Sequence, residues 1–486
     1  MQHRTRVALV ATLGAALAAL GCADQPTVPD RPQPSKSLDV ATMTGGTTPE
    51  LVRMLAAERG ITPLERPAHI RPALVRLGQA LAFDPILSGN HDVSCMTCHM
   101  PKYSTSDGRS LSIGAGGSGF GPDRTHPDGT FIPRNAPALF DLTGLKHMFW
   151  DGRVEVDEHG RFHTPAGAQL TPAMQRVMEF GALSAQPMFP VLARTEMRGQ
   201  SGNELSAIPD DDATAIWAGL MRRLGRVPEY RRMFERAYPG KRFGEMNFAY
   251  ASNAIAAFIV QDLTFNHSPW DRFLAGSDGA LTAQQLEGAR SFLTLKCSQC
   301  HNGPTFSDDR FHDVAVAQIG PGQGEGLSLR DDYGRENVTG DAADRYRFRT
   351  TPLRNVELTA PYGHDGAYAS LRDFVEHYSD SDQKLLAYDP SQLEPDLRGT
   401  VLDDKWAVLQ QRDPLLDGVV LSPELVDDLT AYLESLTDPA ARDLSRLVPD
   451  RVPSGLPVNQ PSGDHGEGGH GHGDHDGHGP HGLARR

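Results

Sequence analysis

Two short stretches of the sequence repeat one spacing of cysteine and histidine, C-x-x-C-H, once in each half of the chain. Their reactive residues are Cys95, Cys98, His99, Cys297, Cys300 and His301. Two thiols one helical turn apart add to the two vinyl groups of one porphyrin, and the imidazole that follows becomes the proximal ligand of the iron. The spacing therefore predicts two covalently bound haem c groups, with His99 on the first iron and His301 on the second.

Two other kinds of site use similar cysteine pairs, namely a zinc site and a thioredoxin-like redox pair. Zinc would need the two pairs close together in space, and it gives no reason for a histidine after each pair. The chain has five cysteines, of which only Cys22 lies outside the two motifs, so no structural disulfide is available. The cysteine usage thus favours haem attachment over both alternatives.

The composition bounds the class of protein and its partners. The chain has 486 residues, which is enough for two or three domains with full cores. Charged residues make up 22% and hydrophobic residues 39%, as in an ordinary globular protein. The net charge of −15 argues against nucleic acid as a partner and favours a neutral or basic docking protein.

Residues 1–22 have the pattern of a bacterial signal peptide. Two arginines precede an apolar run over residues 7–20, which is too short to span a membrane as a mature helix. The run ends in Ala-Leu-Gly-Cys, which resembles a lipobox with Cys22 as the lipidated residue, although Ala19 replaces the usual leucine. The segment predicts export to the periplasm or cell envelope, with membrane contact through a lipid anchor only. Simple secretion is the alternative.

Helices are predicted ahead of each haem motif. Apolar periodicity predicts helices over 50–59 and 71–83 before the first motif, and a capping box at Thr282 begins the helix that leads to the second. Further helices are expected at 212–237 and 245–264, after the cap Ser370, and from Ser422 to about residue 436. Residues 134–200, rich in proline and glycine, are expected to be extended segments around the first haem.

This repeated order of helix, haem motif and loop predicts a mainly α fold with two cytochrome c-like domains, each holding one haem. The expected boundaries are a flexible tether at 23–48, a first haem domain at 49–272 and a second at 273–446. Residues 447–486 are expected to be a disordered tail, because glycine, proline and histidine cannot build a core. Its histidines would bind zinc, copper or nickel only loosely.

Further motifs carry a resemblance to the bacterial dihaem cytochrome c peroxidases, including their MauG-like branch. The resemblance covers roughly residues 70–440. Its motifs are Arg134-Asn135-Ala136-Pro137, Phe149-Trp150-Asp151-Gly152-Arg153, Glu196-Met197, Thr351-Pro352-Leu353-Arg354-Asn355-Val356 and Pro361-Tyr362-Gly363-His364-Asp365-Gly366. The family implies a peroxidatic first haem that reacts with hydrogen peroxide, an electron-transfer second haem, and calcium between the domains.

The resemblance gives three residues catalytic roles. Trp150 matches the indole that lies between the haems and relays electrons. Glu196 matches the group that moves a proton between the oxygens of peroxide, with Gln186 ten residues before it. An additional segment between Trp150 and Gln186, relative to the compact peroxidases, leaves the alignment open there. Ordinary surface positions for Gln186 and Glu196 are the alternative.

Calcium is held in the family by one amide side chain and by backbone carbonyls. These match Asn135, Thr359 and Pro361, and oxygen ligands suit calcium. The family also places a histidine before the Arg-Asn pair, where it caps the resting first haem. His126 lies one residue further away and is followed by Pro127, so ligation of the first haem and a solvated loop position both stay open.

The distal ligand of the second haem departs from the compact peroxidases. They use a methionine fourteen residues after the His-Asp-Gly histidine, and Tyr378 stands there in this chain. No methionine follows Met246, so the other ligands to weigh are His377, His312 or a lysine. Tyr378 shares an apolar helical stripe with Leu371, whereas His377 points about 100° away from it. The resemblance to the MauG-like branch favours Tyr378, and a core tyrosine is the alternative.

These patterns predict a dihaem peroxidase that reduces hydrogen peroxide with electrons from a small redox protein. Tyrosine ligation stabilises ferric iron, so a second haem of low potential is expected, in an enzyme that needs no prior reduction. The alternatives are MauG-like oxidation of a protein residue and pure electron transfer. The sequence leaves the electron donor and the oligomeric state open.

Overall fold

The computed structural model describes residues 46–67, 69–458 and 460. The expectations for the signal peptide with Cys22, for most of the tether and for the histidine-rich part of the tail lie outside the described residues. The described chain from Thr47 onward forms one compact unit. Within these residues, no helix combines the length and the apolar character that a membrane crossing requires.

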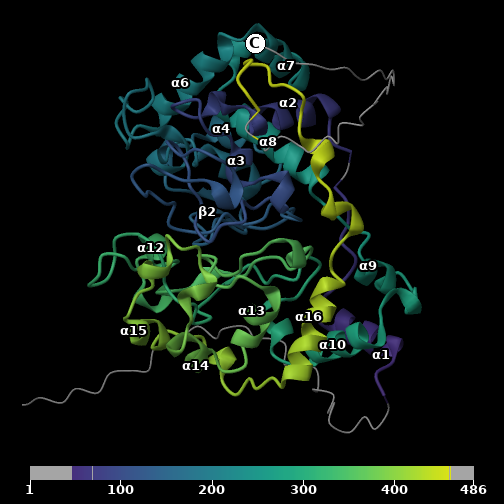
Figure 1. The fold of residues 1–486 in the computed structure, drawn as a ribbon. Coiled ribbons are helices and arrows are strands. Elements are labelled where there is room, and N and C mark those ends of the chain that lie inside the picture. The colour runs from purple at the N-terminus through teal and green to yellow at the C-terminus, as the bar shows by residue number, and fades with distance from the viewer. Residues whose placement is uncertain (1–45, 68, 459, 461–486) are drawn as a thin grey trace, which may run out of the picture. The chain divides into compact units, whose positions relative to one another are not determined.

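The structure is mainly helical, as predicted (Figure 1). Its buried apolar side chains form two hydrophobic clusters. The cluster around the first haem motif contains residues of 70–265 and 441–458, called here the first lobe. Its helices are α2 (Pro72–Phe83), α3 (Cys95–Cys98), α4 (Pro172–Gln175), α5 (Ala182–Ala185), α6 (Ala213–Gly225), α7 (Pro228–Ala237) and α8 (Phe248–Asp262).

The cluster around the second haem motif contains residues of 51–61 and 270–436, called here the second lobe. Its helices are α1 (Pro49–Glu58), α9 (Pro269–Leu274), α10 (Ala283–Thr294), α11 (Cys297–Cys300), α12 (Glu336–Thr339), α13 (Leu371–His377), α14 (Ser381–Leu386), α15 (Lys405–Leu409) and α16 (Pro423–Glu434).

Each lobe is built on one pair of closely packed helices. In the first lobe α2 packs on α8, and a Cβ at Gly78 would lie only 1.8 Å from the carbonyl oxygen of Ala254. In the second lobe α10 packs on α16, and a Cβ at Gly288 would lie 1.9 Å from the carbonyl oxygen of Asp428. Glycine is therefore required at both crossings, where it lets two backbones touch.

Local capping confirms most of the predicted helix boundaries. Thr282 forms the expected capping box with Gln285 at the start of α10. Ser370 caps α13, and Ser422 caps α16, each by accepting a backbone hydrogen bond. The single helix expected over 212–237 is two helices, because Pro228 starts α7 and the residue before a proline is pushed out of the helical region.

The expected domain boundaries need correction at both ends of the chain. α1, assigned to the first haem domain, packs on α10 and belongs to the second lobe (Figure 1). Residues 447–458, assigned to a disordered tail, pack on the first lobe, where Val452 is 1% exposed and Ser454 bonds Asp84. The two terminal segments thus cross between the lobes, because each carries apolar side chains that the other lobe buries.

Residues 134–200 contain short elements rather than purely extended chain. β1 (His147–Met148), β2 (Val154–Val156) and β3 (Phe162–His163) form an antiparallel sheet in which His147 pairs with Glu155 and Val156 with Phe162. A second sheet joins β4 (Phe311–His312) to β5 (Phe348–Arg349). The π-helix η7 (Arg194–Arg198) closes the segment, and such π turns are frequent at functional sites.

Candidate haem centres and active site

The two attachment motifs fold alike and fit covalent haem. Each forms one helical turn, α3 and α11, which brings its two thiols to one side. The ring Nδ1 of His99 donates to the carbonyl oxygen of Thr105 at 3.0 Å, and that of His301 donates to Phe306 at 3.0 Å. Since the proton is on Nδ1, the Nε2 lone pair of each imidazole is available to a metal.

Burial supports the same assignment. It lowers the pKa of His99 and of His301, so both rings are held in the neutral form that binds iron. Burial also raises the pKa of the Cys297 thiol to about 11 and that of Cys95 to about 12. The donor set of each motif therefore fits a covalently attached haem better than a zinc thiolate centre, which needs deprotonated sulfur.

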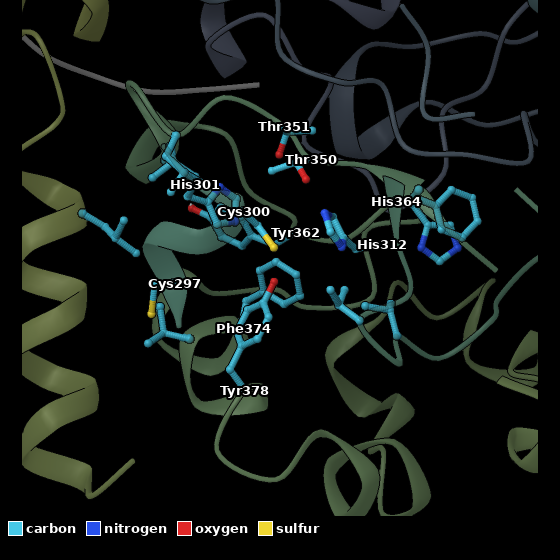
Figure 2. A pocket seen from close by; sticks show the side chains of 18 of the residues that line it. Cys297, Cys300, His301, His312, Thr350, Thr351, Tyr362, His364, Phe374 and Tyr378 are labelled. Carbon is cyan, nitrogen blue, oxygen red and sulfur yellow. Dashed lines mark hydrogen bonds between the residues drawn. The ribbon is translucent and has the colours of Figure 1, made fainter. Parts of the chain in front are cut away.

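A cavity of about 510 Å³ opens beside the second motif. Cys297, Cys300 and His301 line it together with Phe374 and Tyr378, which approach from the end of α13 (Figure 2). Most of the remaining wall is apolar, which suits the face of a porphyrin. The structure thus brings the predicted proximal and distal residues of the second haem into one cavity.

Of the residues considered as distal ligand of the second haem, Tyr378 has the environment expected of a ligand. Its hydroxyl forms no hydrogen bond with any described residue, although the side chain lines the cavity. Burial raises the pKa of Tyr378, and the nearby thiols of Cys300 and Cys297 add to that rise. A half-buried hydroxyl without a partner, beside the attachment cysteines, is placed to meet a group that fills the cavity.

The neighbouring His377 is committed elsewhere. Its Nε2 donates to the carbonyl oxygen of Val314 at 2.6 Å, and its Nδ1 accepts from the hydroxyl of Tyr368 at 2.7 Å. The ring is fully buried, and burial lowers the pKa of His377 to about 4. Both nitrogens of this neutral ring are occupied, so it serves the core of the second lobe.

His312 and the lysines are also engaged. The two ring nitrogens of His312 contact Asp413 at 2.6 Å and Asp308 at 3.2 Å. Burial alone would lower the pKa of His312, but hydrogen bonds to Asp308, Cys300 and Asp413 raise it to about 10. The ring is therefore a cation held by two carboxylates. The lysines of the second lobe bond other groups: Lys296 bonds Asp417, Lys384 bonds Glu376 and Lys405 bonds Leu386.

Glu196 lies on the π-helix η7, beside the first haem motif. The backbone N–H of Ala115 donates to the Glu196 carbonyl oxygen at 2.9 Å, which fixes η7 against the glycine-rich loop. Burial raises the pKa of Glu196, and the guanidinium groups of Arg153 and Arg134 oppose that rise. The Glu196 carboxylate also raises the pKa of the Cys98 thiol, and Glu196 lines a common cavity with Arg134 and Arg153.

Two other predicted residues of the first haem lie at less decisive positions. Gln186 is half-buried where α5 meets the short helix Gln186–Met188, and its side-chain amide bonds no described residue, Glu196 included. His126 is half-buried in a loop, with its Nδ1 accepting from the N–H of Asp128 at 3.1 Å and its Nε2 facing Gly116. The described chain gives neither residue a bond that fixes it toward the first motif.

Trp150 lies where the lobes meet. Its indole N–H donates to the carbonyl oxygen of Asn135 at 2.9 Å, and its own carbonyl accepts from the N–H of Arg349 at 2.7 Å. The side chain lines the cavity of the second haem, although Trp150 follows the first motif in the chain. An indole in this position reaches from the first lobe toward the second haem.

The three predicted calcium residues line the same cavity as Trp150. Asn135, Thr359 and Pro361 all line the second-haem cavity. The amide nitrogen of Asn135 donates to the carbonyl oxygens of Arg109 and Ser110 at 2.9 and 3.2 Å, which turns the amide oxygen away from them. An amide oxygen turned away in this way is available as an oxygen donor, and calcium at these residues stays a prediction.

Sequence reasoning missed a buried ionic cluster that joins the lobes. Arg134 donates to both carboxylate oxygens of Asp332 at 2.6 and 2.7 Å and to Asp151 at 2.5 Å. Arg153 also bonds Asp151 at 3.1 Å and stacks on the ring of Phe149. Arg134 and Asp151 stood inside the quoted motifs, but nothing in the sequence pairs them with Asp332, 198 positions from Arg134.

Comparisons with known proteins agree with this site. Residues 72–279 match the family described as di-haem cytochrome c peroxidase. The chain is 31% identical over 301 residues to cytochrome c551 peroxidase of Pseudomonas aeruginosa, covering 62% of this chain and 69% of the relative. It is 28% identical over 318 residues to the methylamine utilization protein MauG of Methylorubrum extorquens, covering 65% and 71%.

Its fold is similar to that of a MauG-like protein associated with microbial copper homeostasis, with a TM-score of 0.54 and 23% identity over 80% of this chain and 96% of the other. That structural likeness, at 23% identity, shows the fold alone. The peroxidase relative, at 31% identity, also indicates the activity. The cysteine and histidine geometry of both motifs accords with them. The chain therefore belongs to the dihaem cytochrome c peroxidase family, in its MauG-like branch, and carries two c-type haems.

Proposed function

We propose that this peroxidase reduces hydrogen peroxide to water at the first haem with Glu196 as its proton-transfer group. Each peroxide takes up two electrons and two protons and gives two waters. The bound haems supply the iron that receives peroxide and the store of electrons. The observation that carries the proposal is that Glu196 lines one cavity together with Arg153 and Arg134, while its carboxylate raises the pKa of the Cys98 thiol in the first haem motif. A pure electron carrier has no use for a carboxyl so placed.

The environment of Glu196 suits a group that takes up and returns a proton. Burial raises its pKa toward the pH at which the enzyme works, while Arg153 and Arg134 keep the ionised form accessible. The carboxylate accepts the proton of one peroxide oxygen and returns it to the other. The Gln186 amide, which has no partner among the described residues, is free to orient the peroxide by hydrogen bonding.

The second haem is assigned to His301 and Tyr378, with Trp150 as the relay between the lobes. The support is that Tyr378 lines the cavity of His301 with a hydroxyl that no described residue binds, while His377 and His312 are occupied. A phenolate ligand stabilises ferric iron. This observation also favours a second function, the MauG-like oxidation of a protein residue, because such a second haem stays oxidised before peroxide arrives.

The proposal also covers the cellular location of the enzyme, its calcium site and its partners. Export and lipidation at Cys22 would hold it in the periplasm or cell envelope, and calcium would bind at Asn135, Thr359 and Pro361. Hydrogen peroxide and a small redox protein are its partners. With a net charge of −15, the enzyme would be approached best by a neutral or basic donor.

Peroxide titration of the purified ferric enzyme, followed by optical spectroscopy, tests the function. We expect two thioether-linked haems per chain, a high-spin ferric first haem, and reaction with peroxide without prior reduction. A pure electron carrier would instead show two low-spin haems whose spectra do not change when peroxide is added. Turnover with a reduced small cytochrome would separate the peroxidase from an enzyme that oxidises only protein residues.

A further inference from the structure

A second cavity, of about 550 Å³, lies between the lobes and is lined by Glu196. The first lobe contributes Thr164 and other residues that follow the β2–β3 hairpin, and the second lobe contributes residues such as Val338 on α12. This cavity is separate from the one that holds the second haem motif, with which it shares no lining residue.

The two arginines that line the cavity are already paired. Arg134 is bonded to Asp332 and Asp151, and Arg153 is bonded to Asp151 at 3.1 Å. Glu155, which also lines the cavity, is bonded to Arg335 at 3.0 Å. Guanidinium groups committed in this way do not form an open anion receptor. The cavity therefore offers hydrogen-bonding groups to a small neutral molecule rather than a binding site for an anion.

Glu196 connects this cavity to the first haem motif. It lines the cavity together with Arg134 and Arg153, and its carboxylate raises the pKa of the Cys98 thiol in that motif. The cavity therefore opens onto the group to which the proposed function gives the proton transfer at the first haem.

We propose that this interlobe cavity is the route by which small neutral hydroperoxides reach the first haem, and that the segment after β3, with Thr164, sets its width. The proposal rests on the assigned function in one respect, the identity of the oxidant. The route itself concerns access to the first haem and applies to any small neutral ligand of its iron.

Blocking the cavity with a chemical label tests the route. In the holoenzyme, Thr164→Cys places a thiol on the cavity wall, and reaction with a bulky maleimide fills the space; the side chain of Thr164 bonds no described residue, so the exchange disturbs little. Glu158→Cys is the matched control, on the exposed turn of the same hairpin, where the side chain of Glu158 is 79% exposed. Labelled and unlabelled samples come from one preparation, so folding is the same in both.

The readout is the rate at which hydrogen cyanide, a small neutral ligand, binds the ferric first haem. We expect the label at position 164 to slow cyanide binding, and kcat/KM for hydrogen peroxide, by about tenfold or more, while the label at 158 leaves both within about twofold. Unchanged cyanide binding in the labelled Thr164→Cys protein would overturn the route. If cyanide binding slows but no variant or parent enzyme reduces peroxide, the route stands and the assigned function fails.

Discussion

Replacing Glu196 by glutamine isolates the proton-transfer step. Glutamine keeps the shape of the side chain but can neither accept nor release the proton at neutral pH. The Glu196 side chain forms no hydrogen bond with any described residue, so the exchange breaks none of these contacts. The backbone contact of Ala115 with the Glu196 carbonyl oxygen does not involve the side chain. Glu196→Gln should therefore leave the fold and the haem spectra nearly unchanged.

The expected loss is the usual contribution of a positioned acid–base group, about 10²–10⁴-fold in the rate of peroxide cleavage. That range corresponds to roughly 2.7–5.4 kcal/mol of activation free energy. The substitution should lower the free energy of unfolding by much less than this loss in activation free energy. Because burial raises the folded-state pKa of Glu196, the native state disfavours its ionised form, and removing the ionisable group relieves that cost at neutral pH.

The pH dependence has a definite sign. A carboxyl whose folded pKa exceeds its unfolded value stabilises the protein most below the unfolded pKa, and this contribution is lost as pH rises through the folded pKa. Relative to Glu196→Gln, the wild type should thus lose stability as pH rises above the usual carboxyl range. Its peroxide reaction should slow as pH falls through the raised pKa of Glu196, because the carboxylate is then protonated; the variant should lack this acid limb.

Stopped-flow mixing of the ferric enzyme with hydrogen peroxide over a range of pH measures both effects. Glu158→Gln is the matched control, because Glu158 is an exposed carboxylate on the hairpin turn and should react as the wild type does. Glu196→Asp should recover part of the rate, since it restores a titratable carboxyl at a longer distance. A Glu196→Gln enzyme with the wild-type rate and the wild-type acid limb would remove Glu196 from the mechanism.

Three further outcomes follow from the geometry. Tyr378→Phe should change the ferric spectrum of the second haem and raise its potential while leaving the unfolding temperature close to that of wild type; a spectrum identical to wild type would refute the ligand assignment. Arg134→Met leaves the buried carboxylate of Asp332 without its guanidinium partner, although Asp151 keeps Arg153, and should cost about 3–5 kcal/mol in urea unfolding. Arg161→Met, in its exposed pair, should cost at most about 1 kcal/mol, and equal losses would contradict the cluster's role. Calcium added to chelator-treated enzyme should raise the unfolding temperature of wild type but not of Asn135→Ala, and an equal rise in both would exclude Asn135 as a ligand.

The sequence alone determined the features that depend on neighbouring residues. Covalent haem attachment needs two thiols and an imidazole within one helical turn, so Cys95, Cys98 and His99 carry the whole signal in five positions. Helix starts were equally local, because caps such as Thr282 and Ser370 bond the backbone three residues ahead. The mainly helical fold followed from these signals and from the apolar periodicity.

Motif resemblance went further than local pattern at Glu196 and Trp150, but it supplied only their identities. The structure adds that Glu196 lines a cavity together with Arg134 and Arg153. It also adds that Trp150 donates to Asn135 and accepts from the backbone of Arg349. The boundary errors at α1 and at residues 447–458 have one cause. The sequence of a short apolar segment does not show which lobe buries it, since burial depends on a surface assembled from distant parts of the chain.

Tertiary structure alone shows how differently Tyr378 and His377 are placed. The two are adjacent in sequence and both are able to bind iron, and they differ by about 100° around the helix axis. Packing of α13 turns His377 into the core, where Tyr368 and Val314 occupy both ring nitrogens, and leaves Tyr378 facing the haem cavity. The pairing of Arg134 with Asp332 was likewise beyond local reasoning, because only the folding of one lobe against the other brings such distant charges into a shared, water-poor site.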